Sequence, residues 1–183
     1  MTADPIAEAR EGWTAAGWGS TALAMANITS IMRVQQILLA QINAVLRPYE
    51  ISFARLEVLM VLLMTGEPGG LPLGQVGTRL QVNPGAVTSA MDRLEADGLV
   101  RRIAHPTDRR ATLAVITPRG RTLALDAIAD VNALVLEPFE PSGTAGEELF
   151  ALLRDIRAAA GDLDLVTADA APARRTQPRR SDG

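Results

Sequence analysis

The stretch VGTRLQVNPGAVTSAMDRLEADGLVRR, residues 76–102, decides the fold of this chain. Asn83 suits the cap of a helix, and Pro84 suits its first position, where a missing N–H costs nothing. Gly98 follows where a left-handed C-terminal cap belongs. The segment therefore predicts one well-delimited helix of about four turns.

The two faces of this predicted helix differ in chemistry. Val87, Met91 and Leu94 recur at helical spacing and predict the face that packs on a core. The opposite face is small and polar with one cation near its end, and carries Gly85, Thr88, Ser89, Asp92 and Arg93. Small side chains at a helix N-terminus let its N–H groups approach a polyanion closely.

A short helix over about residues 73–80 precedes the capped helix. Two glycines weaken it, so packing must hold it in place. Only Gln81 and Val82 separate it from the cap, and such a tight turn between two helices is typical of a helix-turn-helix. In that arrangement the capped helix is the recognition helix.

A β-hairpin is predicted directly after the capped helix. Residues 99–103 and 112–116 are β-branched or alternate in polarity, and the interval between them is polar. This connection carries Arg109 and Arg110, so the hairpin has an arginine-bearing loop. Of Arg101 and Arg102, which alternate sides on the first strand, we expect one to contact the backbone of a polyanion and the other to pack or pair.

Longer helices flank this centre. Caps and apolar spacing predict four of them, over about residues 21–46, 53–65, 118–136 and 145–160. Ser20 is the predicted cap of the first, and Pro138 closes the third. Thr144 with Glu147 forms a capping box for the fourth. The first helix is apolar over more than one stripe, so it needs a partner surface.

Charge is unevenly distributed along the chain. The formal net charge is −3, but residues 79–121 contain eight arginines and four acids and so carry +4. Residues 122–173 contain two arginines and ten acids, which gives −8. A basic centre between acidic segments is expected if one element faces a polyanion, although clustering on a solvated face explains the charge alone equally well.

The composition argues against several classes of protein. The 183 residues include no cysteine, one histidine and no lysine, which leaves no thiol chemistry, no histidine-rich metal cluster and no phosphate-loop lysine. We therefore expect no enzyme, no cofactor and no metal. The first twenty residues do not read as a signal peptide, and the longest unbroken apolar run is far shorter than the roughly 18 residues that span a bilayer. A soluble, cytoplasmic protein without membrane association is expected.

The order of predicted elements is that of a winged helix-turn-helix flanked by further helices. Over about residues 28–163 the sequence resembles the MarR family of bacterial transcription regulators. The resemblance rests on the stretch quoted above, on DRR at 108–110 and on LAVITPRG at 113–120. The combination of the Asn-Pro cap, the D-x-R wing and the T-x-x-G helix start is specific.

The resemblance implies a mainly α fold with a small β-hairpin wing and with N- and C-terminal dimerisation helices. It also implies a homodimer that places two winged lobes on double-stranded DNA, at a pseudo-palindromic operator. In such proteins a small molecule commonly binds between the dimer helices and the lobes. The wing aspartate, Asp108, braces the guanidinium of Arg110, which enters the minor groove.

The candidate DNA-binding residues follow from both lines of reasoning, and they are Asn83, Gly85, Thr88, Ser89, Arg93, Arg109 and Arg110. The family often has serine in place of Gly85 and a longer side chain in place of Ser89, so direct base readout is expected to be thin. His105 falls in the wing and receives no special role. The sequence identifies no ligand-binding residues.

The expected organisation is an N-terminal extension and dimerisation helix over 1–47, a DNA-binding lobe over 48–117, dimerisation helices over 118–166 and a disordered tail over 167–183. The expected function is sequence-specific transcription regulation, as a homodimeric repressor that a small-molecule effector relieves. The alternative is a winged-helix dimer that serves as a protein-interaction module without specific DNA binding.

Overall fold

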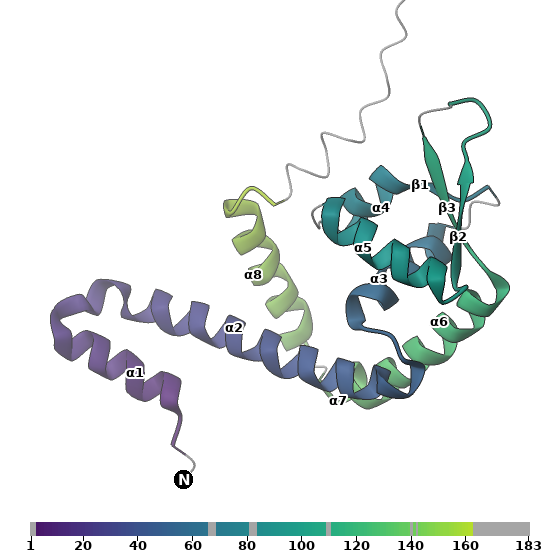
Figure 1. The fold of residues 1–183 in the computed structure, drawn as a ribbon. Helices are drawn as coiled ribbons and strands as arrows, with labels where there is room; N and C mark the ends of the chain where they lie inside the picture. Colours follow the sequence, from purple (N-terminus) through teal and green to yellow (C-terminus); the bar gives the residue numbers. More distant parts are fainter. Residues whose placement is uncertain are drawn as a thin grey trace, which may run out of the picture. The chain divides into compact units, whose positions relative to one another are not determined.

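The computed structural model describes residues 3–65, 69–80, 84–108, 111–139, 141 and 143–162 (Figure 1). It is mainly helical with one small antiparallel sheet, as predicted. The chain divides into two compact units, and the divisions fall within α3, within α6 and after Phe139. The first unit contains the described residues up to Leu56 together with Leu123–Phe139, and the second contains Glu57–Thr122 and the described residues after Phe139.

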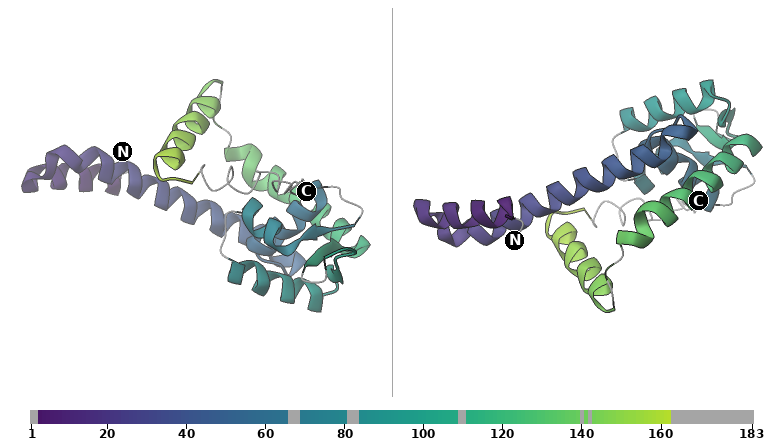
Figure 2. Two further views of the ribbon diagram at one scale, coloured as in Figure 1. Left: turned by 90° about the horizontal axis from the view of Figure 1, so that it is seen from above. Right: turned by 90° about the horizontal axis from the view of Figure 1, so that it is seen from below.

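The first unit opens with a helical hairpin. Helix α1 spans Pro5–Trp13, a π-helical turn spans Thr14–Trp18, and α2 spans Gly19–Leu46. The chain reverses at Gly17, whose φ of +91° is costly for any residue with a side chain. Both views of Figure 2 show α1 lying along the first part of α2. The short helix α1 was not predicted.

Two tryptophans join the arms of this hairpin. The ring centroids of Trp13 and Trp18 lie 4.9 Å apart at an interplanar angle of 59°, a favourable tilted arrangement. The indole Nε1 of Trp13 donates to Oγ1 of Thr21 at 3.1 Å. Ala22 and Ala26 are the buried residues in this part of α2, and small side chains let two helices approach closely.

Helix α2 leaves much of its apolar surface uncovered. The region Pro5–Tyr49 contains a stretch that is long and apolar enough to cross a membrane by length and composition, and 11% of that window is buried. The exposed large apolar side chains of α2 are Leu23, Ile28, Ile31, Met32, Val34 and Ile37. A helix that packs against another protein chain shows the same pattern, so this surface needs a partner.

The remainder of the first unit surrounds the end of α2. A 3₁₀ turn, Arg47–Tyr49, leads to the start of α3 (Phe53–Thr65). The hydroxyl of Tyr49 donates to Oδ2 of Asp130 on α6 at 2.6 Å, which joins segments 81 residues apart in sequence. The apolar side chains buried in this part of the unit are Ile42, Leu46, Ile51, Leu56, Ala124, Ala127, Val131 and Val135.

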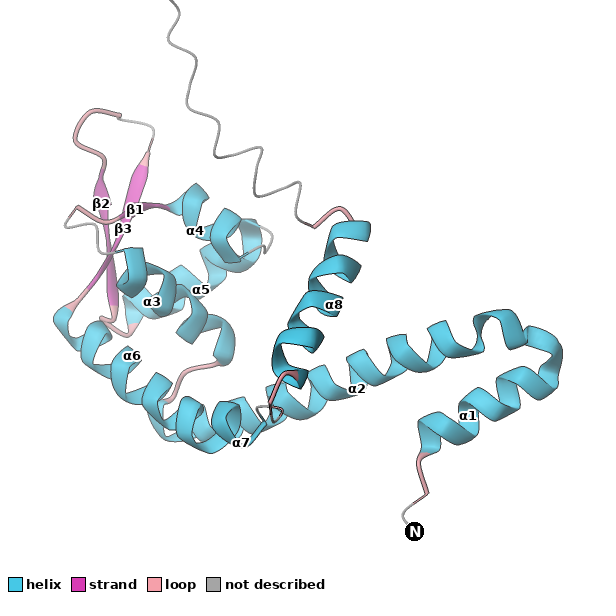
Figure 3. Cartoon of the chain, turned by 180° about the vertical axis from the view of Figure 1, so that it is seen from behind, coloured by secondary structure: helices cyan, strands magenta, loops and turns pink. Residues whose placement is uncertain are grey.

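The second unit contains the winged lobe. Its elements after α3 are β1 (Leu71–Pro72), α4 (Leu73–Leu80), α5 (Pro84–Ala96), β2 (Val100–Ala104), β3 (Thr112–Ile116) and the start of α6 (Pro118–Val131). The three strands, coloured magenta in Figure 3, are antiparallel in the order β1–β3–β2. The predicted hairpin is confirmed, with Val100 opposite Ile116 and Ala104 opposite Thr112.

A single core holds the helices of this lobe to the sheet. Its buried apolar side chains come from α3, α4, α5, all three strands and the turn before β2, and include Val58, Leu59, Leu71, Val76, Val87, Met91, Leu94, Leu99, Val100, Leu113 and Ala114. The edge strand β1 was not predicted. Two residues are too few to show an alternating pattern, and pairing of Leu71 with Ala114 defines the strand instead.

Two predicted helix boundaries were wrong. Helix α2 begins at Gly19, so Ser20 lies inside it, and its capping residue Trp18 makes no side-chain bond. Pro138 does not end the third long helix, because a π-helical turn over Asn132–Leu136 leads into α7 (Glu137–Phe139). The N–H of Glu137 bonds to the carbonyl of Asn132, and this wider turn accommodates the proline that follows.

The predicted capping box before α8 (Ala145–Ala159) is also wrong. Thr144 has φ −76° and ψ −12°, which is helical, whereas a capping side chain needs an extended backbone. Its hydroxyl donates instead to Oε1 of Glu148 at 3.1 Å. Helix α8 buries no residue and exposes Leu149, Phe150, Leu152 and Ile156, so it too presents an uncovered apolar surface.

Candidate DNA interface

Helices α4 and α5 form the predicted helix pair, and α5 occupies the position predicted for the recognition helix. Val76 of α4 is fully buried, as is Met91 of α5, and Val87 and Leu94 complete the inner face of α5. The turn that joins the two helices, residues 81–83, lies outside the described residues, and with it the predicted cap Asn83.

The outer face of α5 is exposed over its whole length. All five residues placed there from the sequence are exposed, namely Gly85, Thr88, Ser89, Asp92 and Arg93. The helix ends as predicted at Gly98, which has a φ of +69°. The N–H of Leu99 bonds to the carbonyl of Leu94 at 2.9 Å, which closes the left-handed cap. The face therefore has the small, polar surface that close contact with a groove requires.

The wing is the connection between β2 and β3. The N–H of His105 donates to the carbonyl of Ala111 at 3.1 Å, and the N–H of Ala111 donates to the carbonyl of Asp108 at 3.1 Å. The second bond joins the two described ends of the loop, Asp108 and Ala111. Arg109 and Arg110 themselves lie outside the described residues. Asp108 is exposed and belongs to the turn that leads into them.

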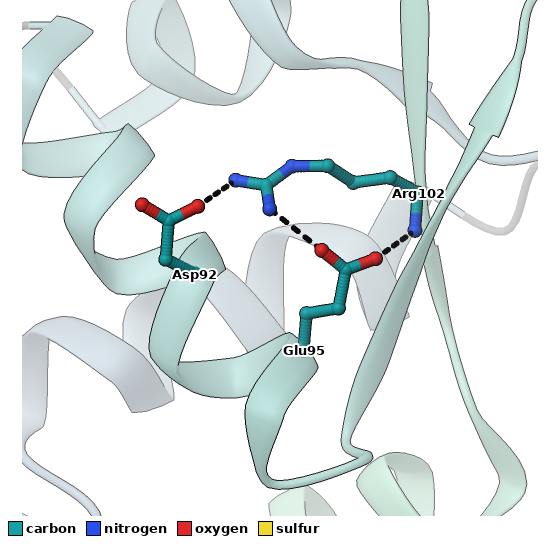
Figure 4. Close-up of polar contacts among 3 residues, drawn as sticks. All are labelled: Asp92, Glu95 and Arg102. Atoms are coloured by element: carbon teal, nitrogen blue, oxygen red, sulfur yellow. Dashed lines mark hydrogen bonds and ion pairs between the residues drawn. The ribbon is translucent and has the colours of Figure 1, made fainter.

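Arg102 of β2 connects the wing to the recognition helix (Figure 4). Its Nη2 lies 2.6 Å from Oδ1 of Asp92, and its Nη1 lies 2.6 Å from Oε2 of Glu95. The main-chain N–H of Arg102 also donates to Oε1 of Glu95 at 2.8 Å. Asp92 and Glu95 are three residues apart on α5, so one guanidinium spans both carboxylates.

These contacts change the proton affinity of Glu95. The main-chain N–H of Arg102 and then its guanidinium stabilise the carboxylate and hold the pKa of Glu95 below its usual range. Glu95 therefore stays ionised, and bound to Arg102, to a lower pH than an ordinary glutamate.

The alternation predicted for Arg101 and Arg102 is confirmed in part. Arg102 is half-buried and paired, while Arg101 is exposed on the other side of the strand. The partners Asp92 and Glu95 were missed. Their spacing of three on one helix, followed by a strand that carries arginine, is the signal that identifies such a pair.

A second connection ties the end of α5 to the start of α6. The hydroxyl of Thr117 donates to the carbonyl of Gly98 at 2.9 Å and accepts the N–H of Gly120 at 3.0 Å. A Cβ on Gly120 would collide with the carbonyl oxygen of Leu99. The T-x-x-G motif thus requires glycine because the two backbones approach closely here.

We searched the described residues for side chains that could hold a metal ion or a cofactor. Among the described residues, no group of three or more His, Asp or Glu side chains could hold a metal ion. An open groove of about 660 Å³ lies between α1 and α2. The exposed charged residues Asp4, Arg10 and Glu11 line it, so it is a solvated groove and its lining indicates no ligand.

A helix-turn-helix followed by a β-hairpin wing, with long helices before and after it, defines the class of winged helix-turn-helix proteins. Within that class, the sequence profile of the MarR family matches residues 49–111. The chain is 43% identical to Sco5413, a MarR family transcriptional regulator from Streptomyces coelicolor, with a TM-score of 0.67 over 76% of this chain and 96% of that one. The chain belongs to the MarR family.

Further relatives are also transcriptional regulators. The repressor Rv2887 of Mycobacterium tuberculosis is 35% identical over 102 residues, which cover 52% of this chain and 73% of Rv2887. CouR from Rhodococcus jostii RHA1, in a structure with p-coumaroyl-CoA, is 28% identical with a TM-score of 0.59 over 71% of this chain and 88% of CouR. Two other curated regulators are matched over only 55% and 58% of their own length.

Proposed function

We propose that this chain is a sequence-specific DNA-binding regulator that acts in the cytoplasm as a homodimeric repressor and is relieved by a small molecule. One observation carries the DNA-binding part. The exposed polar face of α5 and the arginine-bearing wing are joined through Arg102, so a helix suited to the major groove and a loop suited to the minor groove belong to one lobe.

In this proposal the recognition helix approaches the major groove with its N-terminal half. Gly85 permits close approach of the backbone, and Thr88 and Ser89 supply hydroxyls that read base edges directly or through water. Arg93, about two turns after the start of α5, contacts phosphate. Asn83 caps the helix next to the phosphates. With such short side chains, DNA shape contributes a large share of the specificity.

The wing supplies the arginines. Arg110 enters the minor groove, braced by Asp108, and Arg109 contacts phosphate. A narrow A/T-rich groove concentrates negative potential, and a planar cation in a tight loop loses little entropy on entering it.

Dimerisation accounts for the uncovered apolar surfaces. The exposed faces of α2 and α8 cost free energy in water unless another chain covers them. A two-fold dimer lets the same surface of two copies cover itself. It also presents two recognition helices, which suits half-sites about one helical turn apart.

Two relatives support repression and its relief. Rv2887 is named a transcriptional repressor, and the structure of CouR contains p-coumaroyl-CoA. An effector that binds the free dimer more tightly than the DNA-bound dimer would release the operator.

DNA binding at two salt concentrations tests the proposal. Promoter fragments next to the gene are titrated with the wild type, with Arg110→Ala and, as a control, with Arg10→Ala on α1. We expect Arg110→Ala to weaken binding by about tenfold and to reduce the slope of log affinity against log salt by about one. Arg10→Ala should match the wild type, because α1 lies outside the winged lobe.

The same titration separates the alternative function. A protein-interaction module would bind these fragments weakly and without sequence preference, and footprints would lack a two-fold repeat. If Arg110→Ala and the wild type bind with equal affinity and equal salt slope, Arg110 of the wing does not contact DNA.

A further inference from the structure

His105, the single histidine of the chain, occupies the base of the wing. Its half-buried ring turns back over the loop that follows it. The imidazole Nδ1 lies 3.1 Å from the main-chain N of Asp108 and 3.3 Å from that of Thr107. The Thr107 hydroxyl lies 3.4 Å from the same nitrogen.

The two backbone groups fix the protonation of the ring. A main-chain N–H can only donate, so Nδ1 accepts and carries no hydrogen, while Nε2 carries the hydrogen of the neutral ring. The imidazole thereby does what an Asn or Asp side chain does when it accepts N–H groups two and three residues ahead in a turn. A protonated imidazole has hydrogens on both nitrogens and cannot make these bonds.

We infer that His105 is the positioning residue of the wing, with its unprotonated Nδ1 holding the backbone of Thr107 and Asp108 in the turn that leads to the two arginines. The inference rests on the proposed function of the wing. His105 also contacts the other end of the loop. Its main-chain N–H donates to the carbonyl of Ala111, and the main-chain N–H of Ala111 donates to the carbonyl of Asp108.

Of the described loop residues that follow His105, one carries an ionisable side chain. Asp108 lies in the same turn, and the arginines at positions 109 and 110 follow it in sequence. The strand ends that border the loop carry Ala104, Ala111 and Thr112, which do not ionise.

The inference can be tested without DNA, because one histidine gives one pair of ring nitrogen signals. The full-length protein labelled with ¹⁵N-histidine should show an unprotonated Nδ1 and a protonated Nε2 at about pH 8. The amide of Asp108 should exchange slowly in the wild type and lose its protection in His105→Ala. In His105→Asn the amide should stay protected. A protonated Nδ1 at pH 8, or an unprotected Asp108 amide, overturns the inference.

Binding to operator DNA is the second measurement. At pH 8, His105→Ala should bind about three- to tenfold more weakly than the wild type, the factor expected for one net hydrogen bond. His105→Asn should bind within about twofold of the wild type, since it keeps the acceptor.

The outcomes distinguish a failure of the proposed DNA-binding function from a failure of the positioning role of His105. Wild-type protein that does not bind DNA contradicts the proposed function, while the amide exchange still reports on the turn. Wild-type binding that His105→Ala leaves unchanged contradicts the positioning role alone.

Discussion

The carboxylate of Glu95 binds Arg102 twice, with one oxygen accepting the main-chain N–H at 2.8 Å and the other contacting the guanidinium at 2.6 Å. A side chain on the last turn of α5 therefore holds both the backbone and the side chain of strand β2. Rotation of the recognition helix against the wing would break two contacts at once. Asp92 provides a third contact from one helical turn earlier.

Replacement of Arg102 by Gln should weaken DNA binding by about tenfold. The guanidinium is occupied by carboxylates, so its loss removes no phosphate contact and the salt slope should stay at the wild-type value. Affinity falls because α5 and the wing lose their fixed relation and because two carboxylates beside the DNA lose their counter-charge. Titration of one operator fragment over a range of salt concentrations measures both quantities.

The neighbouring arginine is the matched control. Arg101 is exposed on the opposite side of the same strand. Arg101→Gln should reduce the salt slope by about one, as expected for a lost phosphate contact. The assignment of the two arginines is wrong if Arg102→Gln reduces the slope and Arg101→Gln does not.

Sequence reasoning was most successful where local chemistry decides the structure. The helix 84–96, its end at Gly98 and the pairing of residues 100–104 with 112–116 follow from caps, a left-handed residue and alternation. It failed at Pro138, where a π-helical turn admits proline, because such a turn has no sequence signature of its own. Strand β1 exists only through its pairing with β3, which is a tertiary contact.

The candidate site was predictable in the same uneven way. The exposed residues of α5 follow from helical periodicity, because an outer face is defined once the apolar face is known. The bonds of Arg102 to Asp92 and Glu95 depend on how β2 packs against α5, which no single segment specifies. The bonds that Nδ1 of His105 accepts from Thr107 and Asp108 were not predicted, because Asn and Asp are the usual acceptors in such turns.

Replacement of Gly120 by Ala should destabilise the winged lobe. The added Cβ meets the carbonyl oxygen of Leu99, which is backbone and cannot rotate away. Overpacking of this kind costs about 1–3 kcal/mol of the free energy of unfolding. Chemical denaturation measures the loss, and Gly74→Ala is its control.

Nothing lies within 4 Å of a Cβ at Gly74, so that change should leave the stability unchanged or raise it by up to about 1 kcal/mol. Equal stabilities of the two variants would contradict the close approach.

Replacement of Ile31 by Glu should weaken the dimer at least tenfold. Ile31 belongs to the exposed apolar face of α2, and a two-fold interface would contain the new carboxylate twice. Sedimentation velocity over a range of concentrations measures the change. Gln36→Glu adds the same charge at a polar position of the same helix and should dimerise like the wild type. A wild-type chain that sediments as a monomer would contradict the dimer itself.

The bond between Tyr49 and Asp130 makes a prediction for alkaline solution. The hydroxyl donates to the carboxylate, and this bond first, then burial and the negative charge of Asp130, raise the pKa of Tyr49 from 10.0 to about 12. Since the folded pKa lies above the unfolded one, the contribution of this bond to stability is fully present below pH 10 and is lost as the pH rises towards 12.

Tyr49 is the single tyrosine of the chain, so the ultraviolet absorbance of its phenolate reports on this group alone. In the native protein the absorbance should rise with a midpoint near 12, and in denaturant near 10. Asp130→Ala should bring the native midpoint back towards the denatured one, whereas a native wild type that already titrates near 10 would show that the bond is not formed in solution.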